Sequence, residues 1–412
     1  MYAWNEEQLM IRDAVRDFIE REIAPRREEL EFGDMPPYDL LRKLFSTFGM
    51  DQMAKDRFAK TIAFEKSVEA AIAAGETPPE KPASGDGHDP SLTMIPIIEL
   101  CRYSPGMVTA MGVSMGLASA AIMSKGTTAQ KERWALDLLT LDKVGAWAIT
   151  EPNSGSDAFG SMKATARRDG DEYVLNGSKT FITNGPYAET VIFICKLDEG
   201  NPPEDRKILS FVLDTGMDGL EQSKPLRKMG MHSSPTGELF LDDVRVGIDR
   251  LIGETEDLPS GGREGAKATF AIERSGVAAM ALGMIDKALE LSIEYAKERV
   301  QFGQRIGDFQ LIQDKLARME MARLNVENMV FRYIETSRDG VDLSLAEASA
   351  MKLYSARAAT EVALEAVQIF GGNGYMSEFQ VEQIARDAKV LQIYAGTDEL
   401  QITHIAKDLL RR

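Results

Sequence analysis

Cysteine and histidine are scarce in this chain. Two cysteines, Cys101 and Cys195, and three histidines, His88, His232 and His404, occur in 412 residues. Two cysteines cannot form a disulfide framework, and no cysteine or histidine spacing is typical of a structural zinc site. We therefore expect a chain from a reducing compartment, without a metal site, in which both cysteines are packing residues and the histidines are structural.

Long apolar runs and excess positive charge are also missing. No run approaches the roughly 18 consecutive apolar residues of a membrane-spanning helix, and the opening MYAWNEEQL has neither the basic segment nor the apolar core of a signal peptide. The sequence thus predicts no membrane span and a cytoplasmic location. The 48 Lys and Arg residues face 65 Asp and Glu residues, a net charge of −17 spread along the chain. This balance argues against nucleic acid as a partner.

A glycine-rich loop of the nicotinamide type is absent as well. No GxGxxG segment lies at a predicted strand-to-helix turn, so a Rossmann site for NAD has no support. What the chain has is length for two or three domains and a hydrophobic pattern that changes twice.

Residues 1–143 have the periodicity of helices, with apolar residues at positions 9, 11, 15, 18, 19 and 23. An insert at about 51–91 combines a predicted helix with a stretch at 75–91 that is rich in proline, glycine and charge. Such a composition buries too little apolar surface to order itself. We predict an N-terminal helical domain with a loop there that is mobile or held by a partner.

Residues 144–258 show short β-rich runs separated by turn residues, which predicts a compact β-barrel-like domain. Asn176-Gly177 is a hairpin signal, and Asn184-Gly185 is a second turn of the same kind. Helical periods return in residues 259–412 and predict an antiparallel four-helix bundle, with GGNGY at 371–375 interrupting two helices. The predicted fold class is α+β, mainly α.

Three separated stretches resemble the acyl-CoA dehydrogenase family: residues 147–157 (WAITEPNSGSD), 301–310 (QFGQRIGDFQ) and 368–375 (QIFGGNGY). The order helical, β, helical is similar to that family's architecture over nearly the whole chain. The resemblance implies FAD as cofactor and oxidation of acyl thioesters. The insert at 51–91 departs from the family, which usually runs from a helix straight into a short glycine-rich loop, and we expect the insert to cover or flank the acyl pocket.

A fourth stretch, residues 393–399 (IYAGTDE), carries Ala395 where most of the family has the glutamate that removes the substrate's α-proton. The isovaleryl-CoA and long-chain branches carry their base on a helix, at the position of Glu273. The resemblance therefore implies Glu273 as the base, a role that suits a carboxylate desolvated by an apolar pocket. An isolated glutamate of this kind would otherwise be interpreted as a partner in a surface ion pair. Asp398 and Glu399 are weaker candidates.

The same resemblance implies two groups of flavin contacts. The ring and pyrophosphate group comprises Trp147, Ile149, Thr150, Gly155, Ser156, Phe181, Thr183, Thr397 and Glu399. The adenosine diphosphate group, which the family binds mainly across subunits, comprises Arg299, Phe302, Gln310, Gln368, Gly371 and Gly372. This implies a homotetramer arranged as a dimer of dimers. Without the family, Phe181 would be read as strand core, Arg299 as a solvated charge and GGNGY as a helix C-cap.

The resemblance also implies a substrate side, comprising Ser156, Arg274, Ala395, Gly396 and Lys407. The backbone amide of Ala395 would donate to the acyl carbonyl, together with the flavin ribityl 2′-hydroxyl, and would survive replacement of the usual glutamate. Lys407 stands where an arginine is common and would act as a point charge.

The implied activity is dehydrogenation of an acyl-CoA to a trans-2-enoyl-CoA. Glu273 removes the α-proton, the β-hydride passes to the flavin, and the electrons pass to an electron-transfer flavoprotein. The relocated base favours acyl groups with a branch near the β-carbon. One rival is a flavin monooxygenase or oxidase, which tolerates Ala395 and consumes oxygen. Another is a catalytically silent acyl-CoA-binding subunit, which has no need of bound, yellow flavin.

Overall fold

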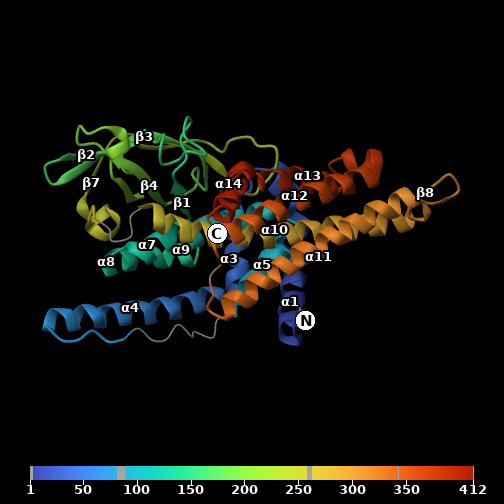
Figure 1. Cartoon of the computed structure of the whole chain (residues 1–412), viewed down its shortest axis with the longest axis horizontal. Coiled ribbons are helices and arrows are strands. Elements are labelled where there is room, and N and C mark those ends of the chain that lie inside the picture. The colour runs from blue at the N-terminus through green and yellow to red at the C-terminus, as the bar shows by residue number, and fades with distance from the viewer. Residues whose placement is uncertain (1–2, 81–88, 258–261, 342, 412) are drawn as a thin grey trace.

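The structure is a computed structural model that describes residues 3–80, 89–257, 262–341 and 343–411, with the side chains of 262–272 outside the description. It has three parts in chain order: a set of helices, a curled sheet and a second set of helices. In Figure 1 the sheet lies above the first helices, and the longest helices run from the middle of the molecule to one far end. The predicted mainly helical α+β class is confirmed.

The N-terminal helices pack around apolar residues that include Phe18, Leu41 and Phe45. The first helix begins with a capping box, in which the Asn5 side chain accepts from the Gln8 amide and the Gln8 side chain accepts from the Asn5 amide. The helices are α1 (Glu6–Glu22), α2 (Arg27–Phe32), α3 (Tyr38–Thr47), α4 (Met50–Ala74), α5 (Ser91–Cys101), α6 (Pro105–Gly112), α7 (Ala120–Lys125), α8 (Thr128–Gln130) and α9 (Leu136–Leu139).

The helix predicted within the insert is α4. Its buried residues, Phe58 and Ile62, join a cluster that contains Trp134 and lies against one face of the sheet. Most of α4 is exposed, and Figure 1 shows it projecting below the sheet. Of the loop predicted after it, at 75–91, residues 81–88 lie outside the described residues.

The central sheet has seven strands in the order β1-β4-β2-β3-β7-β6, with β5 paired to β4. Alternation along β4 places Val191 and Phe193 on one face and Ile192 and Ile194 on the other. The first face packs in the sheet's own core, and the second packs on the N-terminal helices. The strands are β1 (Gly145–Ala148), β2 (Thr165–Asp169), β3 (Glu172–Thr183), β4 (Thr190–Leu197), β5 (Ile208–Asp214), β6 (Leu220–Gln222) and β7 (Thr236–Gly247).

The hairpin predicted at Asn176-Gly177 is wrong. Both residues lie inside β3, where the register with β7 shifts, so this pair marks a bulge rather than a turn. The β2–β3 hairpin turns instead at Gly170, whose φ is 63°. Asn184 does lie in a turn, with φ 64°, but the turn connects β3 to β4, which do not pair.

The C-terminal helices are α10 (Gly262–Glu298), α11 (Gln310–Arg338), α12 (Leu345–Phe370), α13 (Gln380–Val390) and α14 (Asp398–Leu409). A hairpin of β8 (Val300–Gln301) and β9 (Gln304–Arg305) joins α10 to α11 at the far end of the molecule (Figure 1). Gly283 of α10 lets α5 approach, because an added Cβ would lie 2.1 Å from the carbonyl oxygen of Ile98. The predicted interruption at Gly371–Tyr375 is present as a short 3₁₀ turn between α12 and α13.

One helical stretch, Pro105–Lys125, is long and apolar enough to cross a membrane by length and composition alone. Nearly half of its residues are buried inside the fold, where Ala118 and Ile122 pack against the sheet-facing cluster. A core helix has the same composition. Both cysteines, Cys101 and Cys195, are buried and free, as predicted.

Candidate active site

The end of β1 and the middle of β3 form one wall of the predicted flavin site. Trp147 lies in β1, and the chain leaves that strand through Ile149 and Thr150. The amide of Thr180 donates to the carbonyl of Thr150 at 2.9 Å, so the segment after β1 runs beside β3. Two stretches that are distant in sequence are therefore adjacent in the fold.

A buried ion pair holds this wall. Lys179 is fully buried, and its Nζ donates to the Ile149 carbonyl at 3.0 Å and to the Glu151 carboxylate at 2.8 Å. The same carboxylate accepts from the amides of Lys163 and Ala164 at 2.7 and 3.0 Å. Burial lowers the pKa of Lys179, and its hydrogen bond to Glu151 opposes that effect. The position of the Ile149 backbone thus depends on a pair that solvent does not reach.

The turn after this wall exposes backbone amides. Glu151 and Ser154 exchange two backbone hydrogen bonds, of 3.1 and 3.0 Å, which close a tight loop. Gly155 and Ser156 follow and are exposed, and within the described part of the chain no acceptor is assigned to their amides. A Cβ added to Gly155 would meet nothing within 4 Å. Adjacent exposed amides beside open space suit a phosphate group.

Phe181 lies on the surface rather than in the strand core. The β3–β7 register shifts between Lys179 and Ile182, and Phe181 between them has φ 57°. This bulge turns the ring outward, so that Phe181 is 68 % exposed, while Thr183 at the end of β3 is partly buried. A large exposed ring at a strained backbone position fits contact with a flat group such as a flavin.

Glu273 and Arg274 lie in the part of α10 that faces α12 and the loop before α14. Arg274 is buried, and its Nη1 donates to Ser349 Oγ at 3.0 Å. Glu273 is partly buried, and burial raises the pKa of its carboxyl to about 7 against the opposing charges of Arg274 and Lys352. A carboxylate whose pKa lies near neutrality can accept a proton and return it.

The predicted base loop lies beside this pair. A Cβ added to Gly396 would lie 3.6 Å from Arg274 Nη2, so the loop and α10 are neighbours. Ala395 and Gly396 have φ values of 53° and 85°, a left-handed turn. Among the described residues no acceptor is assigned to the amide of Ala395. The structure therefore places the predicted base loop beside Arg274, the neighbour of Glu273 on α10, and the charge of Glu273 acts on Tyr394 just before the turn.

The remaining ring-side and substrate-side residues lie on α14 and just before it. Thr397 is the N-cap residue of α14, and Glu399 lies in its first turn and is exposed. Lys407 is exposed near the end of the helix. Between them His404 is partly buried, and burial and the nearby charge of Arg274 lower its pKa.

The predicted adenosine diphosphate group gathers at the opposite end of the bundle. Tyr295 of α10 stacks on Phe370 of α12 with ring centroids 4.1 Å apart, and its hydroxyl accepts from Asn373 at 3.1 Å. These contacts place the end of α10 beside the end of α12. The predicted residues at this end are all exposed: Arg299, Phe302, Gln310, Gln368, Gly371 and Gly372.

Within one chain the two flavin groups are far apart. Figure 1 shows the sheet on one side of the molecule and the β8–β9 hairpin, next to Arg299 and Phe302, at the far end of α10 and α11. Phe302 is 94 % exposed. A single chain therefore does not assemble all the predicted flavin contacts.

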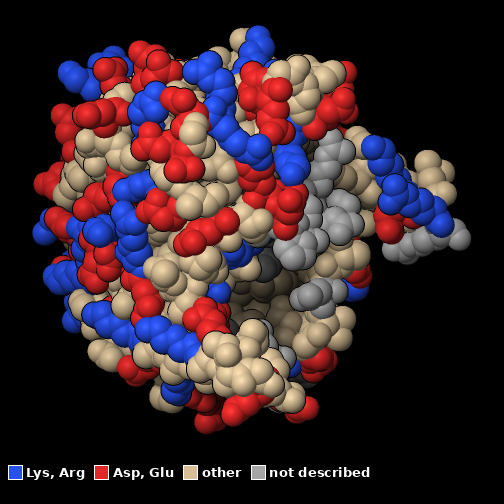
Figure 2. Space-filling view, turned by 90° about the vertical axis from the view of Figure 1, so that its left-hand side faces the viewer, with Lys and Arg blue, Asp and Glu red and all other residues tan. Residues whose placement is uncertain are grey.

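Figure 2 shows the side of the molecule that is on the left in Figure 1. This face is hollowed, and elsewhere on it Lys and Arg alternate with Asp and Glu, without a large patch of one sign. The acidic surplus is not concentrated there. Among the described residues no group of three His, Cys, Asp or Glu side chains is placed to hold a metal ion.

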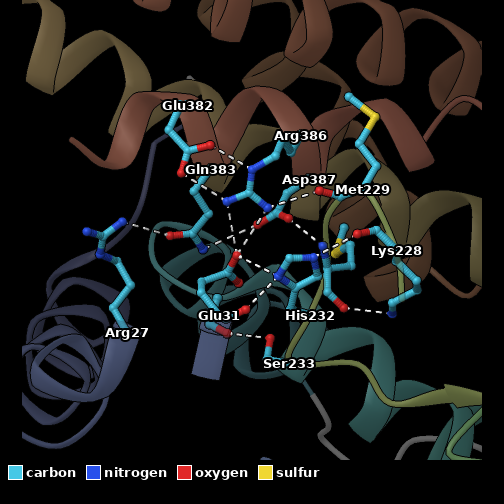
Figure 3. A network of polar contacts seen from close by, with 12 residues as sticks. Arg27, Glu31, Lys228, Met229, His232, Ser233, Glu382, Gln383, Arg386 and Asp387 are labelled. Atoms are coloured by element: carbon cyan, nitrogen blue, oxygen red, sulfur yellow. Dashed lines mark hydrogen bonds and ion pairs between the residues drawn. The ribbon is translucent and has the colours of Figure 1, made fainter. Parts of the chain in front are cut away.

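A polar network joins all three parts of the fold next to the base loop (Figure 3). Arg386 of α13 pairs with Glu31 of α2 at 3.2 Å, and Asp387 accepts from the amide of Met231 in the β6–β7 connection. His232 lies 2.6 Å from the Glu31 carbonyl oxygen through Nδ1 and 2.9 Å from the Lys228 carbonyl oxygen through Nε2. Burial and the nearby Glu31 raise the pKa of Asp387. Because α13 leads into residues 391–397, this network fixes where the base loop begins.

Several supporting residues were not predicted from the sequence, among them Lys179, Glu151, Lys352 and Gln401. One signal for Lys352 is present in the sequence: it stands on a helix face made otherwise of small and apolar residues, mostly alanine and serine. A lysine on such a face is rarely buried without a specific partner.

Sequence models of one family match almost the whole chain. The N-terminal domain of the acyl-CoA dehydrogenases matches residues 5–55 and 49–142, the middle domain matches 146–244 and the C-terminal domain matches 260–410.

Relatives with similar sequences agree with these domain matches. An acyl-CoA dehydrogenase of Bacillus subtilis is 36% identical over 407 residues, covering 98% of each chain. Isovaleryl-CoA dehydrogenase of Pongo abelii mitochondria is 32% identical, covering 96% of this chain and 87% of the relative. The CarC subunit of the caffeyl-CoA reductase-Etf complex of Acetobacterium woodii is 33% identical, covering 99% and 100%.

Among solved structures, butyryl-CoA dehydrogenase of Megasphaera elsdenii superposes with a TM-score of 0.82 at 32% identity, with each chain covered completely. Fold, domain matches and full-length relatives agree, and the chain belongs to the acyl-CoA dehydrogenase family of FAD-dependent oxidoreductases.

Proposed function

We propose that this protein binds FAD and dehydrogenates an acyl-CoA thioester to its trans-2-enoyl-CoA, with Glu273 as the base. The proposal rests on the left-handed Ala395–Gly396 turn, which lies beside Arg274, and on the adjacent Glu273, whose carboxyl pKa burial raises to about 7. In the reaction the α-carbon loses a proton to the carboxylate of Glu273, and the β-carbon loses a hydride. Bound FAD supplies the acceptor for that hydride, which no side chain provides.

The amide of Ala395 is the proposed hydrogen-bond donor to the thioester carbonyl of the substrate. It points to no acceptor among the described residues, and its backbone conformation is fixed by the left-handed turn. A donor aimed at the thioester carbonyl stabilises the negative charge that develops when the α-proton leaves. Replacement of the usual glutamate by alanine keeps this donor, because the donor belongs to the backbone.

The residues that would hold FAD fit the group. Exposed amides at Gly155 and Ser156 suit the pyrophosphate, and Trp147 and Phe181 offer rings to the flavin ring system. The adenosine diphosphate residues lie at the far end of the same chain, so they would serve the flavin of a neighbouring copy. We infer a homotetramer arranged as a dimer of dimers, in the cytoplasm.

The acceptor of the electrons is proposed to be an electron-transfer flavoprotein. The name of the relative CarC places that protein in a complex with Etf. The same name describes a reductase, and the same base and donor serve an enoyl-CoA in the reverse direction. Which direction dominates depends on the potentials of flavin and substrate.

The substrate class is proposed to be acyl-CoA with a branch near the β-carbon. Placing the carboxylate on α10 leaves only a methyl group at position 395, which opens space beside the reacting carbons. Support comes from the 32% identity to isovaleryl-CoA dehydrogenase. Ser156, Arg274 and Lys407 are the candidates for contact with the CoA portion.

Anaerobic titration of the purified, yellow enzyme tests the proposal. Isovaleryl-, isobutyryl-, butyryl-, octanoyl- and palmitoyl-CoA are added in turn while bleaching of the flavin absorption is followed. We expect bleaching, fastest with isovaleryl-CoA. A clear preference for octanoyl-CoA contradicts the branched substrate. Failure of every acyl-CoA to bleach bound flavin favours the silent subunit, and rapid reoxidation of the bleached flavin when air is then admitted favours the oxidase.

A further inference from the structure

Lys352 is a fully buried lysine in the first half of α12, and its ammonium group meets the predicted base loop. Its Nζ donates to the carbonyl of Gly396 at 2.7 Å. Lysine is seldom buried without a partner, because removing its charge from water is costly. The side chain is therefore held inside by what it contacts.

The turn that Lys352 contacts is one that the chain does not adopt unaided. A non-glycine residue in the left-handed region costs about 1–2 kcal/mol, and Ala395 has φ 53°. Gly396 follows at φ 85°, and an added Cβ would lie 2.8 Å from Gln401 Nε2. Tertiary contacts must hold such a turn in one conformation.

Two buried side chains supply those contacts. Gln401 is fully buried, and its Nε2 donates to the carbonyls of Ala395 and Gly396 at 3.1 and 2.7 Å. Lys352 adds the third donor, again on Gly396. With both carbonyls turned toward α12 and α14, the amide of Ala395 is left for a ligand on the other side of the turn.

Lys352 also contributes to the electrostatic environment of the proposed base, Glu273. Its positive charge and that of Arg274 lower the pKa of Glu273, against the larger effect of burial. Lys352 lies 3.9 Å from Asp398, which Arg357 holds from outside at 2.9 Å. Among the described residues, Glu399 on α14 also acts on Lys352, and Tyr394 in the loop is within reach of the charge of Glu273.

We propose that Lys352 is a positioning residue for removal of the α-proton: its ammonium holds the Ala395–Gly396 turn so that the Ala395 amide meets the thioester carbonyl, and its positive charge favours the carboxylate form of Glu273. This inference rests on the proposed dehydrogenation. It assigns to α12 a part of the site that neither Glu273 nor the flavin contacts supply. Removal of the charge should therefore change the pH dependence of proton abstraction, which loss of packing alone would not do.

The test uses the FAD-loaded enzyme as Lys352→Met, Lys352→Arg and the matched control Arg357→Met. Arg357 shares the Asp398 partner but is more than half exposed and does not contact the turn. The probe is a 3-thia-acyl-CoA, which can lose its α-proton but has no β-hydride to give. The long-wavelength absorption of its enolate against the flavin is measured from pH 6 to 9.

For Lys352→Met we expect the pH at which this absorption is half-maximal to move up by about one unit, which corresponds to an about tenfold smaller equilibrium constant for loss of the proton. Lys352→Arg and Arg357→Met should keep the wild-type midpoint. An unchanged midpoint in Lys352→Met overturns the inference, as does an equal shift in Arg357→Met.

If Lys352→Met does not hold FAD, Lys352→Gln removes the charge and keeps a donor, and the same shift is expected. Gln401→Leu separates the two roles: it should weaken the absorption at every pH without moving the midpoint. If acyl-CoA bleaches the flavin of the wild-type enzyme and the Lys352 variants keep the wild-type pH midpoint, only the inference about Lys352 is refuted. Wild-type enzyme that responds to neither ligand refutes the proposed function.

Discussion

At the scale of single residues, the site depends on an exchange between two positions. By the family resemblance Ala395 stands at the position of the usual glutamate, and Glu273 of α10 is the proposed replacement. The carboxyl of Glu273 is desolvated enough for burial to raise its pKa to about 7. Its immediate neighbour Arg274 prevents a larger rise.

Glu273→Gln should slow flavin reduction by about 100-fold or more, because the amide keeps size and hydrogen bonding but cannot accept the proton. FAD content and acyl-CoA binding should stay at wild-type levels. Anaerobic stopped-flow absorbance measures the rate in a single turnover. Adding Ala395→Glu to this variant should restore part of the activity, and a wild-type rate for Glu273→Gln alone would show that another group is the base.

The pH dependence of flavin reduction follows from the same carboxyl. The base must be ionised to act, so the rate at low substrate should rise with pH, by about tenfold per unit below pH 7, and level off above it. A raised pKa moves this rise from the acidic range, where an ordinary glutamate ionises, to neutrality. Rates that are flat between pH 5 and 8 would contradict the assignment.

At the scale of elements, the wall of the predicted flavin site, formed by the end of β1 and by β3, is held by a side chain on its buried side. The chain after β1 and the bulge in β3 are irregular, and no continuous row of hydrogen bonds between strands holds them. Lys179 replaces that row with hydrogen bonds to Ile149 and Glu151 from inside the sheet's core.

The role of the insert helix α4 in covering the acyl pocket stays a prediction.

Lys179→Met should lower the free energy of unfolding by about 3–5 kcal/mol, the range for breaking one partner of a buried ion pair, because the Glu151 carboxylate is left without its cation. The same change should weaken FAD retention. Urea unfolding and flavin absorbance after gel filtration measure the two effects. Lys163→Met is the control, since that side chain is exposed and only its backbone amide bonds Glu151. Equal stability of both variants would contradict the role of the pair.

At the scale of the whole molecule, the far end of the bundle exposes apolar side chains that a lone chain would leave in water. They include Phe302, Leu311 and Tyr375, each at least 80 % exposed. Predicted flavin contacts such as Arg299 and Gln368 lie among them. Such a surface favours assembly with a second copy, which would complete the flavin site.

Phe302→Glu should therefore reduce oligomer size and FAD content together, since a buried carboxylate at the contact is unfavourable. Light scattering coupled to gel filtration, with flavin absorbance, measures both quantities. Ile72→Glu is the control, because Ile72 is also exposed but belongs to α4, a helix that Figure 1 shows away from this end. A monomer that keeps FAD and activity would show that one chain suffices.

The sequence alone determined the larger outline of this protein. Helical and β periodicities separated the three parts, because burial of one helix face or alternate strand residues leaves a local pattern. The family motifs were equally local, so the family was identified, and Glu273, Ala395 and the two groups of flavin residues were proposed, before the fold was known. Turn chemistry was less reliable: Asn176-Gly177 forms a bulge, because pairing of β3 with β7 overrode the local hairpin preference.

Only the tertiary structure decided how those residues are supported. Lys179 meets Ile149, and Lys352 meets Gly396, across 30 and 44 positions of sequence. Such contacts leave no periodic signal, because each depends on how separate elements pack and on a buried charge that finds its partner only in the assembled fold. The same holds for the separation of the two flavin groups within one chain, which follows from the length and direction of α10 and α11.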